Sequence, residues 1–221
     1  MSAFISVTEV SKFYGTRKNP IKALGPVNLE IQKGDFVVIL GRSGSGKSTL
    51  LNLMAGLDQV TSGELVVGID NLSKIKAQSM AKYRSKIGII FQFYNLLPNL
   101  NTVENVMMGG WAGGKKVDTK KAENLLKKFG LEHRVKSDVK TLSGGEKQRV
   151  AICRSLIGDP EILFCDEPTG ALDTKNEDQV RAILADLNKE GLTIVMVTHN
   201  PDFASIATKV IRMKDGLIQS M

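Results

Sequence analysis

The sequence predicts an α/β fold that combines a mainly parallel sheet, an antiparallel β subdomain near the N-terminus and an inserted α-helical subdomain. Three observations support this prediction. Apolar and polar residues alternate in short runs in the first third of the chain, the middle third has mainly helical periodicity, and the last third alternates apolar strands with an amphipathic helix. Apolar strands that are separated by helices pair in parallel, with helices covering both faces.

The antiparallel strands are expected at residues 5–7, 27–31 and 64–67, with turn residues between them. A chain of 221 residues is long enough for one domain with a substantial insertion, and no linker divides it.

The middle of the chain, from about residue 80 to residue 157, is expected to be mainly helical, except for an apolar strand at 87–91. One helix in this stretch should span residues 119–129, with Asp118 as its N-terminal cap and Gly130 at its end. The prediction for this stretch is therefore a helical insertion between two parts of a sheet.

The last third of the chain predicts two buried strands, at residues 162–165 and 193–198, with a helix between them. A terminal hairpin is expected from residues 210–213 and 217–219, which flank an Asp-Gly turn. The buried stripe of the helix recurs at helical spacing and consists of Val180, Ile183, Leu184 and Leu187.

A glycine-rich loop, Gly41-Arg42-Ser43-Gly44-Ser45-Gly46-Lys47-Ser48, fits the phosphate-binding pattern G-x-x-x-x-G-K-[ST] at every fixed position. An apolar strand at 36–40 precedes it, and a helix at 48–57 that can stop at Gly56 follows it. Backbone N–H groups and the helix N-terminus of such a loop face the phosphates. Lys47 then reaches the β and γ phosphates, and Ser48 can hold Mg²⁺. These features predict a P-loop NTPase core.

Two adjacent carboxylates, Asp166 and Glu167, follow the apolar strand at 162–165 directly, and Pro168 disfavours its continuation as a central strand. Both acids should therefore lie at the carboxyl edge of the sheet, where such folds bind ligands. Asp166 is placed to hold Mg²⁺, and Glu167 to orient or deprotonate an attacking water. An acidic pair before a proline is by itself only a turn, but beside a phosphate loop it predicts the second half of an ATPase site.

Ser143 and Glu146 form a capping box, S-x-x-E, before a helix-compatible segment at 147–156. The capping box alone does not explain why Gly144 and Gly145 stand between its two partners, because other residues favour a helix more strongly than glycine does. A helix N-terminus that no side chain covers is an anion site, so this segment is interpreted as one.

Charge is concentrated in one segment: residues 115–140 hold nine basic and four acidic residues, a net +5 of the chain's +7. A solvated helix face is the favoured explanation, and a surface that faces an anionic membrane is the alternative. No apolar run approaches the ~18 residues of a membrane span, and the N-terminus lacks a signal-peptide pattern, so the chain is expected in the cytosol. Cys153 and Cys165 lie in apolar stretches typical of reduced packing residues.

Together these motifs resemble those of the ATP-binding-cassette (ABC) ATPases, over nearly the whole chain and in family order. By this resemblance, residues 41–48 are Walker A, Gln92 is the glutamine loop and residues 142–146 are the signature. Asp166 and Glu167 correspond to Walker B and the catalytic glutamate.

Three further positions match the family. Asp173 matches the D-loop, His199 matches the switch histidine, and Tyr14 matches the aromatic residue that stacks on adenine. His199 follows an apolar strand and precedes Asn200 and Pro201, a plausible helix start, so its imidazole should lie at the same sheet edge as Asp166.

The resemblance implies ATP and Mg²⁺ as cofactors. It assigns catalysis to Glu167, His199 and Lys47, and the metal to Ser48, Gln92 and Asp166. Two cassettes of this family pair head to tail, so that each signature covers the γ-phosphate of ATP held by the partner's Walker A. The implied nucleotide contacts are Tyr14, Gly41, Arg42, Ser43, Gly44, Ser45, Gly46, Lys47, Ser48, Thr49, Gln92, Ser143, Gly144, Gly145, Glu146 and Asp173.

The family's organisation implies a single nucleotide-binding domain over residues 1–221. Its catalytic core and β subdomain are expected at about 1–90 and 158–221, and the helical subdomain that carries the signature at about 91–157.

A transporter motor is the favoured role among the cassettes. No coiled-coil heptads separate Lys47 from Ser143, as they would in chromosome-type cassettes, and translation-type members carry two motif sets where this chain has one. The chain would then drive separate integral-membrane subunits from the inner face of the cell membrane, and no nucleic acid is expected. The alternative is a soluble ABC ATPase that acts on nucleic acid or as an assembly factor.

Residues 91–98, 102–106 and 166–173 look like the branch that serves macrolide and antimicrobial-peptide export and lipoprotein release. The sequence departs from the common family pattern in that Glu146 replaces the usual Gln, and Gly170 stands where many members have Ser. The segment 107–116 is also unusually glycine-rich, for which a flexible loop is the simplest explanation.

Overall fold

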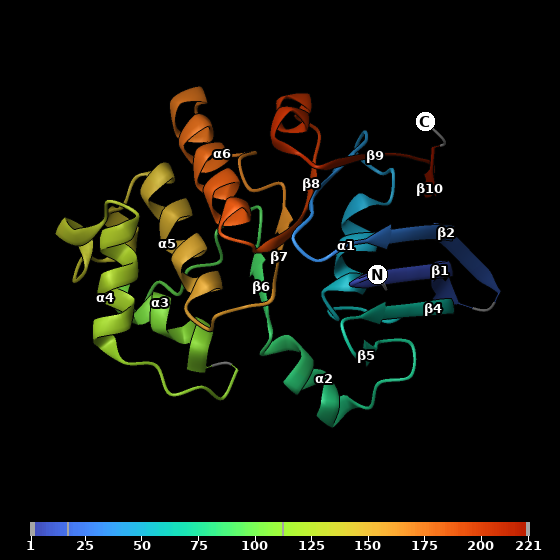
Figure 1. The fold of residues 1–221 in the computed structure, drawn as a ribbon, viewed down its shortest axis with the longest axis horizontal. Coiled ribbons are helices and arrows are strands. Elements are labelled where there is room, and N and C mark those ends of the chain that lie inside the picture. Colours follow the sequence, from blue (N-terminus) through green and yellow to red (C-terminus); the bar gives the residue numbers. More distant parts are fainter. Residues whose placement is uncertain (1–2, 17, 112, 220–221) are drawn as a thin grey trace.

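The computed structural model describes residues 3–16, 18–111 and 113–219. A small antiparallel sheet lies at one end of the molecule, a group of helices from the middle of the chain lies at the other, and a larger sheet lies between them (Figure 1). The α/β fold predicted from the sequence is confirmed.

The antiparallel sheet has the strand order β2-β1-β4-β5. β1 (Ile5–Thr16) pairs with both β2 (Asn19–Ile31) and β4 (Ser62–Val67), and β5 (Asp70–Asn71) pairs with β4. The predicted strands are confirmed, but β1 and β2 are much longer than the alternating runs. Register shifts near Val10 break the alternation of apolar and polar residues. The alternation in the sequence therefore covers only part of each strand.

The larger sheet has the order β10-β9-β3-β8-β7-β6. All neighbours except β10 and β9 pair in parallel, so the carboxyl ends of the strands meet at one edge. β3 and β8 are buried along their whole length. The parallel strands are β3 (Phe36–Leu40), β6 (Ile87–Ile90), β7 (Ile162–Asp166), β8 (Thr193–Thr198) and β9 (Lys209–Lys214).

The predicted terminal hairpin is confirmed: β10 (Leu217–Ile218) turns back antiparallel on β9. The two residues between these strands, Asp215 and Gly216, have φ values of 50° and 75°. Asp-Gly is a preferred pair for a two-residue turn in which both residues have positive φ.

Helix α1 (Lys47–Met54) lies between the two sheets (Figure 1), and Leu50, Leu53 and Met54 join one apolar core with residues of both. The helix is shorter than the predicted range 48–57. Ala55 is its C-terminal cap, and Gly56 adopts φ 64°, a left-handed conformation that ends helices.

A second apolar core lies on the other face of the larger sheet. It is covered by α3 (Thr102–Trp111), α5 (Gly144–Leu156) and α6 (Thr174–Lys189), whereas α2 (Ala77–Arg84) precedes β6. The predicted stripe on α6 is confirmed, with Ile183 partly buried and the rest buried.

The glycine-rich segment is not a flexible loop throughout, contrary to the expectation from sequence. Its first half is the end of α3, and the glycines allow close packing. A Cβ atom on Gly109 would lie 1.9 Å from the carbonyl oxygen of Arg154 on α5, and one on Gly110 would lie 2.0 Å from Cγ2 of Val117. Gly109 is therefore needed because the α5 backbone approaches it closely, and Gly110 leaves room for the Val117 side chain.

Helix α4 (Thr119–Lys128) begins and ends as predicted, because the Asp118 side chain accepts from the N–H of Lys120 and Gly130 has φ 69°. Two of its lysines form ion pairs with other elements, Lys121 with Asp159 and Lys128 with Glu190. These pairs agree with the interpretation of this charged face as solvated protein surface.

The described part of the chain also contains the short 3₁₀ helices η1 (Glu132–Arg134), η2 (Val139–Thr141) and η3 (Pro201–Ile206). Asn200 caps η3, so the helix start expected there is a 3₁₀ turn. Cys153 and Cys165 are buried and form no disulfide, as predicted.

Across residues 3–16, 18–111 and 113–219, none of the helices has the length and apolar character needed to span a lipid bilayer.

Candidate active site

The phosphate loop joins the end of β3 to the start of α1, and Gly44 and Gly46 adopt φ values of 78° and 93°. A Cβ atom on Gly46 would lie 2.8 Å from the carbonyl oxygen of Ala23. Gly46 is also the residue before the helix, so no side chain caps its N–H groups. The loop therefore presents uncapped backbone donors, which suit a phosphate.

A cavity of about 570 Å³ lies over this loop. Most of its lining comes from the loop itself and the first turn of α1, including Thr49. It also includes three predicted site residues from other strand ends, namely Gln92, Glu167 and His199. Residues 21–23 of β2 line it as well; the sequence analysis missed them because nothing in an alternating strand marks its contact with a distant loop.

Lys47 is 6% exposed and lies beneath the loop, where its Nζ atom donates to the carbonyl oxygens of Gly41 at 2.9 Å and Arg42 at 3.2 Å. The same Nζ lies 3.9 Å from Oε1 of Glu167. A buried ammonium beside a set of backbone donors gives the cavity a positive floor.

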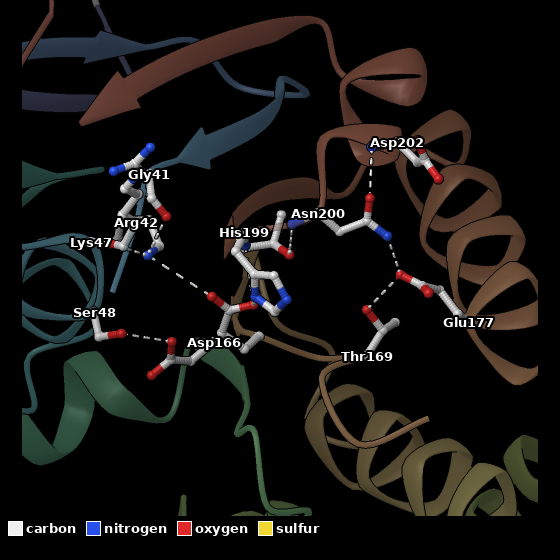
Figure 2. Close-up of polar contacts among 12 residues, drawn as sticks. Gly41, Arg42, Lys47, Ser48, Asp166, Thr169, Glu177, His199, Asn200 and Asp202 are labelled. Carbon is white, nitrogen blue, oxygen red and sulfur yellow. Dashed lines mark hydrogen bonds and ion pairs between the residues drawn. The ribbon is translucent and has the colours of Figure 1, made fainter. Parts of the chain in front are cut away.

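Ser48 lines the cavity and contacts Asp166 directly, with Ser48 Oγ donating to Asp166 Oδ1 at 2.9 Å (Figure 2). Burial raises the pKa of Asp166 and the charge of Glu167 adds to this, whereas the Ser48 hydrogen bond and Lys47 oppose it. Hydroxyl and carboxylate oxygens are ligands that Mg²⁺ accepts, with phosphates and waters completing its octahedron. This pair therefore fits magnesium, although no three acidic, histidine or cysteine side chains cluster as a metal site in the described residues.

Glu167 and His199 follow the neighbouring strands β7 and β8 and contact each other. His199 Nδ1 lies 2.9 Å from Glu167 Oε2, and the His199 backbone N–H donates to the same oxygen at 3.3 Å. The backbone of Glu167 has φ 45°, a left-handed conformation that is strained for a residue with a side chain. Strain of this kind is typical of sites where a side chain must point in one direction.

Tyr14 does not belong to the described lining of the cavity. Its hydroxyl donates to Asp58 at 2.8 Å, and the ammonium of Lys12 lies 4.8 Å from the centre of its ring. Burial and the neighbouring Asp58 carboxylate raise the pKa of Tyr14. Its 42% exposure leaves room for a ligand, and adenine stacking stays a prediction.

The capping box at the start of α5 has the predicted form: Ser143 N–H donates to Glu146 Oε2 at 2.8 Å, and Glu146 N–H donates to Ser143 Oγ at 3.3 Å. A Cβ atom on Gly145 would lie 1.9 Å from Oδ1 of Asn176. Gly145 is therefore explained by packing within the chain, an explanation that the sequence analysis lacked. Gly144 is exposed, although a Cβ atom there would make a tight contact of 3.3 Å with the Tyr94 hydroxyl.

None of the signature residues Ser143 to Glu146 is among the described residues that line the cavity, and neither is Asp173. Asp173 caps α6 by accepting from Asn176 N–H at 2.9 Å. The structure thus brings together the predicted residues of the phosphate loop, β6, β7 and β8, and leaves the signature and D-loop residues outside.

Glu146 is held by more than the capping box, because Arg134 Nε donates to its Oε1 at 2.7 Å. Burial alone would raise the pKa of Glu146, but the bonds from the Ser143 backbone and from Arg134 lower it to about 2. Glu146 is thus a fixed anion that anchors the start of α5.

We expect Glu146→Gln to lower the melting temperature by about 2–4 °C at neutral pH, which corresponds to about 1 kcal/mol. The amide can still accept from Ser143 but loses the charge that pairs with Arg134. The folded-state pKa lies below the ordinary value of 4.5, so this stability is fully present above about pH 4.5 and is lost as the pH falls toward 2.

Thermal unfolding followed by circular dichroism at several pH values measures this difference, with Glu132→Gln as a matched control at an exposed acid nearby. A difference between wild type and Glu146→Gln that stays constant below pH 4.5 would contradict the assignment.

Comparison with known proteins decides the family. Residues 24–170 match the ABC transporter family, and this range includes the phosphate loop, the capped start of α5 and the two carboxylates at the end of β7. The chain belongs to the ATP-binding cassettes of ABC transporters. This cassette is therefore an ABC-type ATP hydrolase.

Among its relatives, the cassette is 42% identical over 217 residues to the macrolide export ATP-binding/permease protein MacB of Mannheimia succiniciproducens, covering 97% of the chain and 34% of MacB. It is 41% identical over 215 residues to the ABC transporter ATP-binding protein YvrO of Bacillus subtilis, covering 96% and 94%. The cassette thus spans about a third of the MacB relatives and nearly all of YvrO.

Among solved structures, the cassette superimposes with a TM-score of 0.89 on the dimeric post-hydrolysis state of the ATP-binding cassette MJ0796 bound to ADP and Pi. That match is 37% identical and covers 98% of this chain and 97% of the other.

Proposed function

We propose that this cassette hydrolyses ATP-Mg in a site that two copies build together, and that it thereby drives separate membrane subunits of an exporter. One observation carries the proposal: Lys47, Ser48, Glu167 and His199 line one cavity, Asp166 is bonded to Ser48 beside it, and the capped start of α5 is outside it. A half-site of this kind needs donors from a second molecule to enclose a γ-phosphate.

Within one copy, each converging residue has a distinct chemical task. Lys47 and the loop N–H groups bind the β and γ phosphates of ATP and offset their charge. Ser48 and Asp166, with Gln92 at the cavity wall, would hold Mg²⁺, which when bound offsets phosphate charge during phosphoryl transfer.

Glu167 is the residue that orients or deprotonates the attacking water, and His199 holds its carboxylate. The 2.9 Å contact between His199 Nδ1 and Glu167 Oε2 supports this division of roles. The His199 backbone N–H adds a second bond to the same oxygen, which leaves Oε1 on the side of Lys47. A base that is fixed in this way loses little freedom when the water aligns.

The second copy would supply Ser143 and the first N–H groups of α5. Ser143 and Gly144 are both exposed, which gives a phosphate access to this helix start. Asp173 would lie in the contact between the copies. The dimeric cassette structures among the relatives support this pairing.

The membrane role is proposed from relatives. MacB joins an ATP-binding part to a permease part in one protein, and this chain covers only the former. A cbiO1 cassette, part of the ABC transporter complex cbiONQ, matches with a TM-score of 0.87 at 30% identity. We therefore assign the chain integral-membrane partners on the inner face of the cell membrane, with export as the direction, rather than nucleic acid.

Co-purification tests the membrane role. The tagged chain, recovered from detergent-solubilised membranes of its own cells, should bring down a multi-span membrane protein in a stable ratio. A parallel nuclease-treated sample and an unrelated tagged ATPase serve as controls. Recovery of stoichiometric nucleic acid with no membrane protein would overturn the role and favour the nucleic-acid alternative.

A further inference from the structure

A carboxylate on α6 joins the two loops that carry Glu167 and His199. Glu177 lies in the first turn of this helix, and its Oε1 atom accepts a hydrogen bond from the Thr169 hydroxyl at 3.1 Å and another from the Asn200 side-chain amide. Figure 2 shows the three side chains converging from the helix and the two loops. Thr169 lies two residues after Glu167, and Asn200 follows His199 directly. One oxygen atom therefore sets the spacing between the two loops.

The two residues that donate to Glu177, Thr169 and Asn200, are themselves held in place by further hydrogen bonds. Thr169 is 6% exposed, and its backbone oxygen accepts from the N–H of Leu172 at 3.0 Å. The Asn200 N–H donates to Thr198 Oγ1 at 3.1 Å, and its side-chain oxygen accepts from Asp202 N–H at 2.8 Å. Thr169 is buried and Glu177 and Asn200 are partly buried, so a bond lost here is only partly replaced by water.

The turn that Thr169 anchors is also the turn that holds Glu167 in its left-handed conformation. The Gly170 N–H donates to the Glu167 carbonyl oxygen at 3.2 Å, which closes the turn around Thr169. A residue with φ 45° stays there only where its surroundings hold it. If the Thr169 anchor is removed, the turn can relax, and the Glu167 carboxylate moves relative to His199.

We propose that Glu177 is a positioning residue for ATP hydrolysis, which acts by fixing the Glu167 turn and the His199 loop at one spacing. The inference rests on the proposed roles of Glu167 and His199. Among the described residues, Glu177 does not line the cavity, and its side-chain hydrogen bonds go to Thr169 and Asn200 and not to the phosphate loop, so nucleotide binding should not depend on it.

The test compares substitutions at Glu177 with a matched acid on the same turn. Glu177→Leu removes both bonds, and we expect kcat to fall about 10- to 100-fold, as for a misplacement of about 1 Å, with little change in KM for ATP. In Glu177→Gln the amide oxygen can take the place of Oε1, so kcat should return to within about threefold of wild type. Asp178→Ala removes a neighbouring exposed acid that bonds only Arg181 among the described residues, and should leave kcat unchanged.

A second variant covers the case in which Glu177→Leu folds poorly. Thr169→Val keeps the shape of the side chain and loses only the donor, and we expect it to lower kcat with only a small fall in melting temperature. Thr169→Val combined with Glu177→Leu should be no slower than Glu177→Leu alone, because both changes break the same bridge.

Three outcomes would overturn the inference: wild-type kcat in both Glu177→Leu and Thr169→Val, a Glu177→Gln variant as slow as Glu177→Leu, or an equal loss in Asp178→Ala. A parallel assay of Glu167→Gln separates the two proposals. Normal turnover in that variant would remove the proposed role of Glu167 itself, whereas an inactive Glu167→Gln beside a normal Glu177→Leu would remove only the role of Glu177.

Discussion

Glu167→Gln should bind ATP with nearly wild-type affinity and lose hydrolysis by about 10²–10⁴-fold, the usual contribution of a positioned general base. Gln keeps the size of the side chain and can accept from His199, but it cannot take a proton from water. The phosphate loop, Lys47 and Ser48 are unchanged, so binding survives. Phosphate release at saturating ATP and direct titration of a fluorescent ATP analogue measure the two properties separately.

The same variant should also accumulate as an ATP-bound dimer, because hydrolysis is the step that would part the two copies. Light scattering should then report about twice the 24.1 kDa mass of one chain when ATP is present. Glu161→Gln, which removes an acid just before the opposite end of β7, is the matched control and should behave as wild type. Undiminished turnover in Glu167→Gln would remove Glu167 from its assigned role.

Lys47→Ala should fail at an earlier step, with ATP affinity reduced about 10- to 100-fold, which corresponds to the 1.5–3 kcal/mol typical of a hydrogen bond to a charged group. The ammonium is the buried cation of the cavity floor and lies within the loop that would hold the phosphates. Equilibrium binding of ATP measures the effect, and hydrolysis should fall with it.

A matched control exists for this lysine, since Lys22 lines the same cavity from β2 but is exposed. Lys22→Ala should change ATP affinity much less, because an exposed charge is screened by solvent. A melting curve for Lys47→Ala checks that the loop keeps its shape once its two carbonyl contacts are gone. Unchanged ATP affinity in Lys47→Ala would count against the phosphate cradle.

Most of the fold followed from local patterns. The buried strands, the Gly56 helix stop, the Asp118 cap and the Asp-Gly hairpin each depend on residues that are close in the chain, so they could be predicted from sequence. Features that depend on contacts between distant segments could not. Gly109 looks like a loop residue until the backbone of Arg154 is placed against it, and Gly145 has no packing role until Asn176 is placed beside it.

The residues of the candidate site also divide into those that a local sequence motif predicts and those that only the fold brings together. The phosphate loop and the acids after β7 were predicted as site residues because each belongs to a contiguous motif at a strand end, although their individual roles stay predictions. Glu177 was missed, because an acid in the first turn of a helix is ordinary and only the fold brings it to Thr169 and Asn200. The hydrogen bond that ties Tyr14 to Asp58 was equally hidden, since 44 positions separate the two residues.

The central claim is that the phosphate loop of one copy and the start of α5 of another form one site, and cross-linking tests it most directly. In the Glu167→Gln background, one chain carries Ser43→Cys and a second, differently tagged chain carries Ser143→Cys. Both positions are exposed, whereas Cys153 and Cys165 are fully buried and should not react. The Ser143→Cys chain still keeps the Glu146 bond to its backbone N–H.

With a short bifunctional thiol reagent, we expect a covalent dimer of the two different chains, only in the mixed sample and only with ATP. Neither chain alone should form it, because a head-to-tail pair places each loop against the partner's α5 and not against the partner's loop. A mixed sample that stays uncross-linked with ATP bound, or an equal cross-link in either unmixed sample, would contradict the shared site.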